Sequence, residues 1–294
     1  MHEEYEAAAA QQHEAADAGT ESSQTVLSHS AQACAPGLWV VATPIGHLED
    51  ITARALQVLR QADRVAVEDT RVSAQLLAHY GIRRPLTALH EHNEAKAVPA
   101  LVEALQRGER VALVSDAGAP LISDPGYRLV RAAQDAGIAV YPAPGPSALI
   151  TALSVAGLAT DRFHFEGFLP AKANARCQRL EQLAEYPHTL VFYESAHRVV
   201  DSVADLRRVF GGAREACLCR ELTKRFEETL RGTLAALRAE LADRDLRGEL
   251  VVLIDRAPDV VVGPEDLDRA LQQALRDHRI KDAAQMVSDA LGLP

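Results

Sequence analysis

The chain has 294 residues, of which 31 are Lys or Arg, 41 are Asp or Glu and 48% are hydrophobic, and its formal net charge is −10. This length suits one large domain or, more often, two domains that share a cleft. No stretch has the roughly 20 uncharged apolar residues that a membrane helix needs, so we expect a soluble protein with no membrane partner.

The first 36 residues differ in composition from the rest of the chain. They contain six acids, no Lys or Arg, and many Ala, Gln and Ser residues, which cannot build a core. We expect residues 1–36 to form a disordered acidic tail. Because this tail lacks the basic start and apolar stretch of a secretory signal, the expected location is cytoplasmic. The remaining chain has a net charge of about −4, which argues against indiscriminate nucleic-acid binding but allows an RNA substrate on a locally basic face.

The four cysteines are Cys34, Cys177, Cys217 and Cys219. The last two alternate along an expected strand and therefore face the same side. The sequence has no CxxC or HxxxH pair that would complete a metal site. We expect buried apolar thiols and no bound metal.

Short apolar runs alternate with amphipathic stretches after Gly37, a pattern typical of a parallel α/β sheet. The expected strands are 38–42, 64–67, 86–89, 110–114 and 138–141. The expected helices are 51–61, 72–80, 94–107, 127–136 and 144–157, with Asn93 as a candidate cap of the third. Residues 37–160 are thus predicted to form an N-terminal α/β domain with a five-stranded parallel sheet.

A second α/β domain with a mixed sheet is predicted over residues 161–257. Its start, residues 163–171, is rich in aromatic residues, Gly and Pro, which indicates a hinge or crossover. The strands expected after it are 189–193, 216–220, 228–232 and 249–254, with helices at 196–210 and 233–241. Residues 258–294 contain two short amphipathic patterns, at 264–277 and 282–291, and are expected to form a helical appendage.

Ligands of open parallel sheets bind at the carboxyl ends of the strands, and polar or Gly- and Pro-rich loops follow all five expected N-terminal strands. Each loop alone could be an ordinary turn, but their convergence on one edge favours a site. No GxGxxG follows the first strand, and no GxxxxGK[ST] occurs, so a dinucleotide fold of the usual type and a P-loop are unsupported. The loop 115–126 carries Asp116 and Asp124 and no Lys, which suits a neutral or cationic ligand better than a triphosphate.

The motifs TPIG, VEDTR, ALHEHN, LVSDAGAPLISDPGYRLV, PGPSA, EGFLPAK, FYESAHR, RELTK and GEL occur in this order between Leu38 and Asp255. Together they resemble the ribosomal RNA small subunit methyltransferase I family of the tetrapyrrole methylase superfamily. The resemblance implies 2′-O-methylation of a cytidine ribose in small-subunit ribosomal RNA, S-adenosylmethionine as cofactor in the cleft between two α/β domains, and a homodimer. The RNA substrate is either naked or part of an assembled subunit.

Carried over by motif, the cofactor-binding positions are Pro44, Gly46, Asp116, Gly118, Pro120, Leu121, Ile122, Pro144, Gly145, Pro146, Ser147 and Ala148 and, from the second domain, Tyr193, Leu222 and Thr223. The positive sulfur of this cofactor agrees with the acidic loop. Three departures from the family pattern concern His47 in place of Asn, Ala119 in place of Thr, and the run 175–178, which is less basic than usual.

Transfer of a methyl group to a ribose hydroxyl requires an acceptor for the hydroxyl proton. The expected catalytic acids are Glu194 first and Asp69 second. Tyr193 or Phe168 could stack a splayed base. The candidate substrate-binding residues, which can act on the hydroxyl or hold phosphates, are Arg71, His90, His92, Asn93, His197, Arg198, Arg220, Glu221, Lys224 and Glu227.

Two other functions fit parts of the sequence. A porphyrinoid C-methyltransferase would use the same fold and cofactor, but the polar loops and the 4% aromatic content argue against a macrocycle trough. A non-enzymatic RNA-binding assembly factor would retain the fold without the reaction, and the intact cofactor motifs argue against it.

Overall fold

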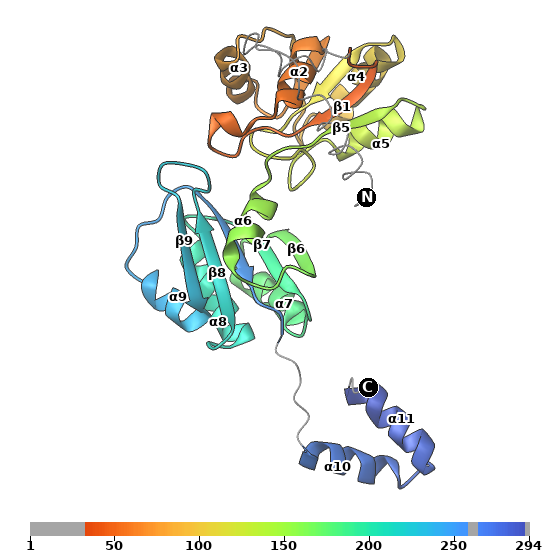
Figure 1. The fold of residues 1–294 in the computed structure, drawn as a ribbon, viewed down its shortest axis with the longest axis vertical. Coiled ribbons are helices and arrows are strands. Elements are labelled where there is room, and N and C mark those ends of the chain that lie inside the picture. The colour runs from red at the N-terminus through yellow and green to blue at the C-terminus, as the bar shows by residue number, and fades with distance from the viewer. Residues whose placement is uncertain (1–32, 258–263, 292–294) are drawn as a thin grey trace, which may run out of the picture. The chain divides into compact units, whose positions relative to one another are not determined.

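The computed structural model describes residues 33–257 and 264–291, in which two five-stranded sheets precede two C-terminal helices (Figure 1). The first sheet is parallel throughout, in the order β3-β2-β4-β1-β5. Leu38, Val65 and Val111 within it are fully buried, as expected for strands that have helices on both faces. The predicted parallel sheet is confirmed, with strands β1 (Gly37–Val41), β2 (Arg64–Val67), β3 (Leu86–Ala88), β4 (Arg110–Leu113) and β5 (Val140–Ala143).

The strand β5 begins two residues later than the sequence pattern predicts and contains Pro142. It pairs with β1 alone, at the edge of the sheet. A residue without an N–H group is tolerated on an edge strand, because only one side of the strand must complete a hydrogen-bond ladder.

Side-chain caps define the starts of two helices in this half. Thr52 accepts a hydrogen bond from Ala55 N at 3.0 Å, so the first helix begins at Ala53. Asp69 accepts from Arg71 N at 2.8 Å. Asn93 occupies the cap position of α4, as predicted, but its side chain makes no capping bond: it accepts from His90 N and donates to Ala88 O. The helices are α2 (Ala53–Gln61), α3 (Thr70–His79), α4 (Glu94–Gln106) and α5 (Tyr127–Asp135), with a short 3₁₀ helix at Leu48–Asp50.

The second sheet is mixed, in the order β6-β7-β10-β8-β9, and only the β6–β7 pair is parallel. This confirms the predicted mixed sheet. Its strands are β6 (Phe163–Phe168), β7 (Thr189–Ser195), β8 (Glu215–Arg220), β9 (Glu228–Thr233) and β10 (Glu249–Ile254), and its helices are α6 (Ala148–Ala156), α7 (Ala173–Leu183), α8 (Val199–Phe210) and α9 (Leu234–Glu240).

Alternate residues of β10 serve two separate cores. Val252 and Ile254 pack with residues of α7, α8 and α9. Val251 and Leu253 pack on the other face with α6. This period of two follows from the pleat of a strand. Ile45, from the loop after β1, joins the α6 core and thus links the first half of the molecule to the second.

The hinge predicted at residues 163–171 is wrong over most of its length. Phe163–Phe168 forms the edge strand β6, and Ala173–Leu183, for which the sequence pattern indicated no element, forms α7. The helix α6 begins at Ala148, four residues later than predicted, and ends at Gly157 in a left-handed conformation. The predicted boundary between domains at residue 160 stays a prediction.

Near the C-terminus, α10 (Pro264–Ala274) and α11 (Ile280–Leu291) contact each other, in agreement with the predicted pair of helices. The acidic tail lies outside the described residues as far as residue 32. Among the described residues, no helix is long and apolar enough to cross a membrane.

Candidate functional site

The loops after β1 and β4 are locked together at the carboxyl edge of the first sheet. Thr43 N donates to Gly118 O at 2.8 Å, and Gly118 N donates to Thr43 O at 3.1 Å. The Thr43 hydroxyl, which is fully buried, donates to Ser115 O at 3.1 Å. These bonds place the acidic loop after β4 beside the TPIG loop, where the sequence predicted a site.

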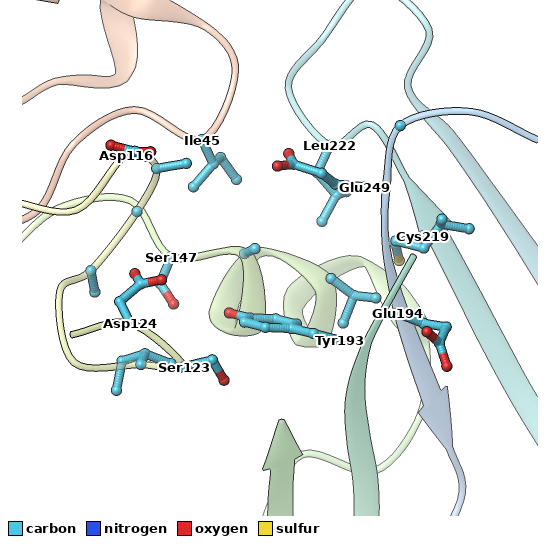
Figure 2. A pocket seen from close by; sticks show the side chains of 18 of the residues that line it. Ile45, Asp116, Ser123, Asp124, Ser147, Tyr193, Glu194, Cys219, Leu222 and Glu249 are labelled. Carbon is cyan, nitrogen blue, oxygen red and sulfur yellow. The ribbon is translucent and has the colours of Figure 1, made fainter. Parts of the chain in front are cut away.

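A cavity of about 400 Å³ opens at this edge and is closed on the other side by the second sheet (Figure 2). The Tyr193 ring lies across its middle, with its hydroxyl toward the side that holds Asp124. The residues that line the cavity are Ile45, Glu68, Asp116, Ala117, Gly118, Ala119, Ile122, Ser123, Asp124, Ser147, Ala148, Phe168, Tyr193, Glu194, Ser195, Cys219, Leu222, Lys224, Gly248, Glu249, Leu250 and Val251.

Three carboxyl groups make one side of the cavity acidic. Burial raises the pKa of Asp124 to about 6, and the neighbouring Asp116 adds to the rise. Burial also raises the pKa of Asp116 and of Glu68, whose carboxyl group is further affected by the charges of Asp124, Asp116 and Asp69. The pKa values are raised because burial and neighbouring negative charges disfavour the ionised carboxylates. A positively charged ligand would stabilise the ionised forms, so this side of the cavity favours a cation.

Backbone strain is concentrated around the cavity. In the described ranges, the non-glycine residues with positive φ are Leu121, Ser123, Glu221 and Thr223, at 74°, 65°, 50° and 65°. They lie in the loop after β4 and in the loop after β8, which contribute cavity-lining residues. Strained backbone of this kind persists where surrounding contacts impose it, commonly at ligand sites.

A close approach between the TPIG and RELTK loops joins the two halves. His47 N donates to Thr223 Oγ1 at 3.1 Å. A Cβ on Gly46 would lie 2.4 Å from Lys224 Cγ and 2.8 Å from Thr223 Oγ1, so only glycine fits without a shift. Because His47 makes this contact through its backbone N–H, the contact does not depend on the side chain at this position.

The loop after β8 is held by ion pairs at the cavity mouth. Lys224 Nζ lies 2.9 Å from Glu221 Oε1 and 2.6 Å from Glu249 Oε2. Glu249 N donates to Glu221 Oε1 at 3.0 Å. The predicted substrate residues Glu221 and Lys224 are therefore paired with each other, and Lys224 lines the cavity.

The predicted cofactor residues fall into two groups. Those that line the cavity are Asp116, Gly118, Ile122, Ser147, Ala148, Tyr193 and Leu222. Those that sit beside lining residues, within the same loops, are Pro44, Gly46, Pro120, Leu121, Pro144, Gly145, Pro146 and Thr223.

Sequence reasoning did not assign Glu68, Ser123, Asp124, Cys219 or the Gly248–Val251 segment to the site. Asp124 had a signal, because it follows a predicted strand in the acidic loop. The Gly248–Val251 segment precedes its strand, where a rule based on carboxyl ends does not look.

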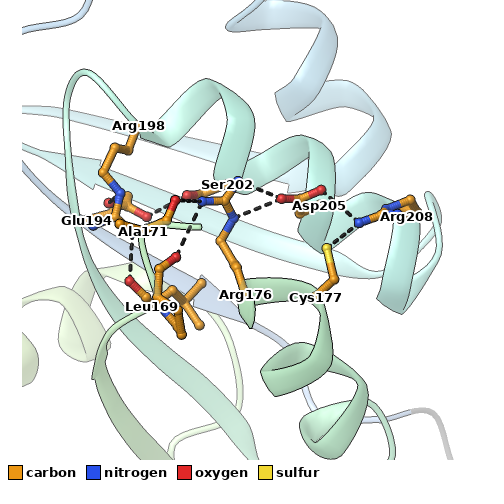
Figure 3. Close-up of polar contacts among 10 residues, drawn as sticks. Leu169, Ala171, Arg176, Cys177, Glu194, Arg198, Ser202, Asp205 and Arg208 are labelled. Carbon is orange, nitrogen blue, oxygen red and sulfur yellow. Dashed lines mark hydrogen bonds and ion pairs between the residues drawn. The ribbon is translucent and has the colours of Figure 1, made fainter. Parts of the chain in front are cut away.

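The carboxylate of Glu194, the first predicted catalytic acid, is engaged by protein groups. It accepts hydrogen bonds from Ser195 N at 2.8 Å and from the Ser202 hydroxyl at 2.5 Å, and it lies 3.4 Å from Arg198 Nε (Figure 3). The side chain is nearly fully buried, and its carboxylate points away from the middle of the cavity (Figure 2). These contacts favour a structural role for Glu194, and its catalytic role stays a prediction.

Asp69, the second predicted acid, is likewise occupied. Hydrogen bonds from Arg71 lower the pKa of Asp69 to about 2, and Arg71 Nη2 lies 2.6 Å from Asp69 Oδ2. A carboxylate with so low a pKa is a weak proton acceptor at neutral pH. Asp69 N donates to Asp116 Oδ1 at 3.0 Å, so Asp69 supports the acidic wall without lining it.

The remaining predicted substrate residues lie outside the cavity wall. His90 and His92 form an edge-to-face ring pair with centroids 6.2 Å apart, and His197 is exposed. Arg220 Nε lies 3.1 Å from Glu228 Oε2, and the Glu227 carboxylate accepts from Thr223 N. Their predicted contacts with a substrate stay predictions.

The cysteines are buried, as predicted. The sulfur atoms of Cys217 and Cys219 lie 3.8 Å apart on β8, and Cys219 forms part of the cavity wall. In the described part of the chain, no group of three or more His, Cys, Asp or Glu side chains is arranged to hold a metal ion.

The chain is similar to a family model and to several named proteins. Residues 37–238 match the family model described as Tetrapyrrole (Corrin/Porphyrin) Methylases. A protein of Xylella fastidiosa named "Ribosomal RNA small subunit methyltransferase I" is 50% identical over 263 residues, which cover 88% of this chain and 96% of that protein. A Pseudomonas aeruginosa protein of the same name is 52% identical over 262 residues, which cover 87% of this chain and 93% of that protein.

A solved structure shares the fold at low identity. It is the uroporphyrin-III C-methyl transferase of Thermus thermophilus complexed with S-adenyl homocysteine, with a TM-score of 0.53 and 20% identity over 74% of this chain and 96% of that chain.

Proposed function

Since this chain belongs to the ribosomal RNA small subunit methyltransferase I family within the tetrapyrrole methylases, we propose that it methylates ribosomal RNA of the small subunit with S-adenosylmethionine. More specifically, we propose that the acceptor is the 2′-hydroxyl of a cytidine ribose. The observation that carries the proposal is the acidic cavity where the loops after β1 and β4 are joined, at the motifs that this family shares. An RNA substrate in the ribosome makes the cytoplasm the expected location.

The residues of the cavity fit the proposed cofactor. A volume of about 400 Å³ is in the range of small-molecule sites. Gly118 adopts φ 83°, and a Cβ at this position would lie 3.2 Å from Ile45 Cγ2, so a side chain would crowd the cavity wall here. Asp116, Asp124 and Glu68 offer negative charge to a cationic sulfur. Asp116, Gly118, Ser147, Ala148 and the flanking loop residues predicted above would hold the cofactor.

S-adenosylmethionine supplies, when bound, an electrophilic methyl group on a positively charged sulfur. The protein's share of the reaction is then to align the hydroxyl oxygen with that methyl group and to receive the hydroxyl proton. Alignment of bound reactants can contribute about 7–11 kcal/mol to the lowering of a barrier. The loops are suited to this task because their strained backbones and mutual hydrogen bonds fix the shape of the cavity.

We propose Asp124 as the acceptor of the hydroxyl proton. Its pKa of about 6 leaves it mostly ionised at neutral pH and so able to accept a proton, and its side chain lines the cavity. The carboxylate of Glu194 is held by Ser195 N and the Ser202 hydroxyl, and that of Asp69 is paired with Arg71 and does not line the cavity. A general base typically contributes about 10²- to 10⁴-fold in rate. Asp124→Asn should therefore lower kcat by about that range, whereas Glu194→Gln should act mainly on stability.

The proposed partner is the small ribosomal subunit or its RNA. The net charge of about −4 in the chain beyond residue 36 favours recognition through shape and local contacts over a strong overall field. We also propose that the protein acts as a homodimer, as implied by family resemblance.

The deciding experiment is transfer of labelled methyl from S-adenosylmethionine to small subunits, and to their isolated RNA, from cells that lack this protein. Nucleoside mass spectrometry should then reveal 2′-O-methylcytidine, and the active form of the substrate shows whether naked RNA is read. Labelled product at a base or at another nucleoside would refute the 2′-O-cytidine assignment. Absence of incorporation with intact cofactor binding would favour a porphyrinoid substrate, and absence of cofactor binding would favour an RNA-associated assembly protein.

A further inference from the structure

Phe168 is a large apolar side chain that stays exposed beside the cavity. It forms part of the cavity wall, yet 55% of its surface is open to solvent. A single exposed hydrophobic residue is ordinary on a protein surface. What distinguishes Phe168 is the number of features that fix its position.

A β-bulge directs the Phe168 side chain. The pairing of β6 with β7 shifts register between Phe165 and Gly167, and Gly167 adopts φ 77°. Bulges of this kind re-aim the side chains that follow them. The rings of Phe168 and Phe165 both meet Tyr193 edge to face, at centroid distances of 5.7 and 4.8 Å. A Cβ on Gly167 would lie 3.1 Å from Ser123 Oγ, so the bulge also abuts the acidic loop of the first half.

The backbone directly after Phe168 is held by Arg198. Its Nη2 donates to Leu169 O at 2.6 Å (Figure 3). The guanidinium is itself placed by Glu194, whose Oε1 lies 3.4 Å from Arg198 Nε and whose other oxygen accepts from Ser202 at 2.5 Å. Glu194 is therefore linked to Phe168 through one arginine and one carbonyl group.

Arg176 holds the next part of the same turn. Its Nη1 donates to Ala171 O at 3.2 Å and lies 3.5 Å from Pro170 O, while Nη2 lies 2.6 Å from Asp205 Oδ2 (Figure 3). Only 4% of Arg176 is exposed. Three consecutive carbonyl groups, of residues 169–171, are thus bound by two arginines that each pair with a carboxylate. These bonds hold the backbone that follows Phe168, and Tyr193 contacts the ring itself.

A rigid exposed ring beside a cofactor-sized cavity suits a planar, unpaired nucleobase, because base stacking on an aromatic side chain is the usual mode of single-stranded RNA recognition. We propose that an unpaired base of the RNA substrate stacks on Phe168, and that Arg198, tied to Glu194, is a positioning residue for this ring. The proposal rests on the proposed function, since it names the part of the RNA that this site contacts.

The first test compares variants of exposed rings on β6. Phe168→Ala should lower kcat/KM for the RNA by about 5- to 150-fold, the loss of one base stack, and Phe168→Trp should retain most of the activity. The control is Phe163→Ala, at the other end of the same strand, where the ring is 41% exposed and does not line the cavity. S-adenosylhomocysteine affinity, measured by calorimetry, should be similar in all four proteins.

Two outcomes of this test would overturn the proposal. Equal kcat/KM in Phe168→Ala and the wild type would show that no base stacks on Phe168. A loss of cofactor affinity as large as the loss of kcat/KM would show that Phe168 contacts the cofactor instead of the RNA. Failure of the proposed function itself would look different, because the wild-type protein would then methylate no RNA.

A double-mutant cycle tests the positioning role. Arg198→Gln should lower kcat/KM when Phe168 is present and add little in the Phe168→Ala background, because it acts through the ring. Arg198→Lys, which retains the positive charge that pairs with Glu194, should lie between the wild type and Arg198→Gln. Equal losses in both backgrounds would mean that Arg198 contacts the RNA itself. Circular dichroism at the assay temperature confirms that each variant is folded.

Discussion

Cofactor binding should depend on pH because the cavity wall is acidic and its carboxyl groups are hard to ionise. Burial raises the pKa of Asp124 to about 6, and the pKa values of Asp116 and Glu68 are raised as well. A cationic ligand favours the ionised form and lowers these pKa values on binding. Binding therefore releases protons at acidic pH. The affinity for the cation is highest well above pH 6, where Asp124 is ionised, and it falls as the pH drops below 6.

The size of the effect follows from the fraction of Asp124 that is ionised. With a pKa of about 6, this fraction falls from about 97% at pH 7.5 to about 9% at pH 5.0. If the cation binds only the ionised form, its affinity falls by about tenfold, or about 1.4 kcal/mol, over this interval. Protonation of Glu68 would add to the loss.

Isothermal titration calorimetry with two ligands isolates the contribution of the sulfur charge to this pH dependence. S-adenosylmethionine carries the positive sulfur, and S-adenosylhomocysteine is its neutral thioether, so the two differ at the atom in question. Only the cation should show the tenfold loss between pH 7.5 and 5.0, and Asp124→Asn should flatten its pH dependence. An equal pH dependence for both ligands would refute the reasoning, because the acidic wall would then not sense the sulfur charge.

Three further predictions concern stability, closure and assembly. Glu194→Gln should lower the free energy of unfolding, measured by urea denaturation, by about 1.5–3 kcal/mol, the value of hydrogen bonds to a charged group. Unchanged stability together with a large fall in kcat would instead indicate that Glu194 takes part in the reaction. Gly46→Ala should weaken cofactor binding, since its Cβ would lie 2.4 Å from Lys224 Cγ, and calorimetry should show no such loss for Gly212→Ala, whose Cβ meets only ordinary contacts. Sedimentation should give twice the chain mass of 31.8 kDa, and a mass of one chain would contradict the homodimer.

The first sheet was predictable because its three central strands, β1, β2 and β4, are mostly buried and carry continuous apolar runs. The errors in the second half have physical reasons. The strand β6 contains a bulge and a glycine at φ 77°, so its side chains do not alternate regularly. The helix α7 has a polar sequence in which Arg176 is buried, and its apolar stripe is correspondingly weak. The sequence alone does not distinguish a buried arginine from a solvated one, because its carboxylate partner, here Asp205, is known only from the structure.

The Gly248–Val251 part of the site could not be predicted, because the strands of the second sheet reverse direction. Glu249 and Leu250 lie opposite Ser195 and Glu194 because β10 runs antiparallel to β7. The amino end of β10 therefore reaches the edge at which β7 ends, and both contribute to the cavity wall. Which end of a strand reaches the site depends on sheet topology, and topology is set by long-range pairing that no local motif encodes.

Contacts within the protein hold the strained loops around the cavity. Each non-glycine residue in a left-handed conformation costs on the order of 1–3 kcal/mol, and Leu121, Ser123, Glu221 and Thr223 carry this cost. The cost is offset by bonds that need no ligand, among them the paired Thr43–Gly118 backbone bonds and the Lys224 ion pairs. A cavity whose strain is already offset by protein contacts need not be reorganised by its ligand. More of the ligand's binding energy is then available for holding the reacting atoms in line.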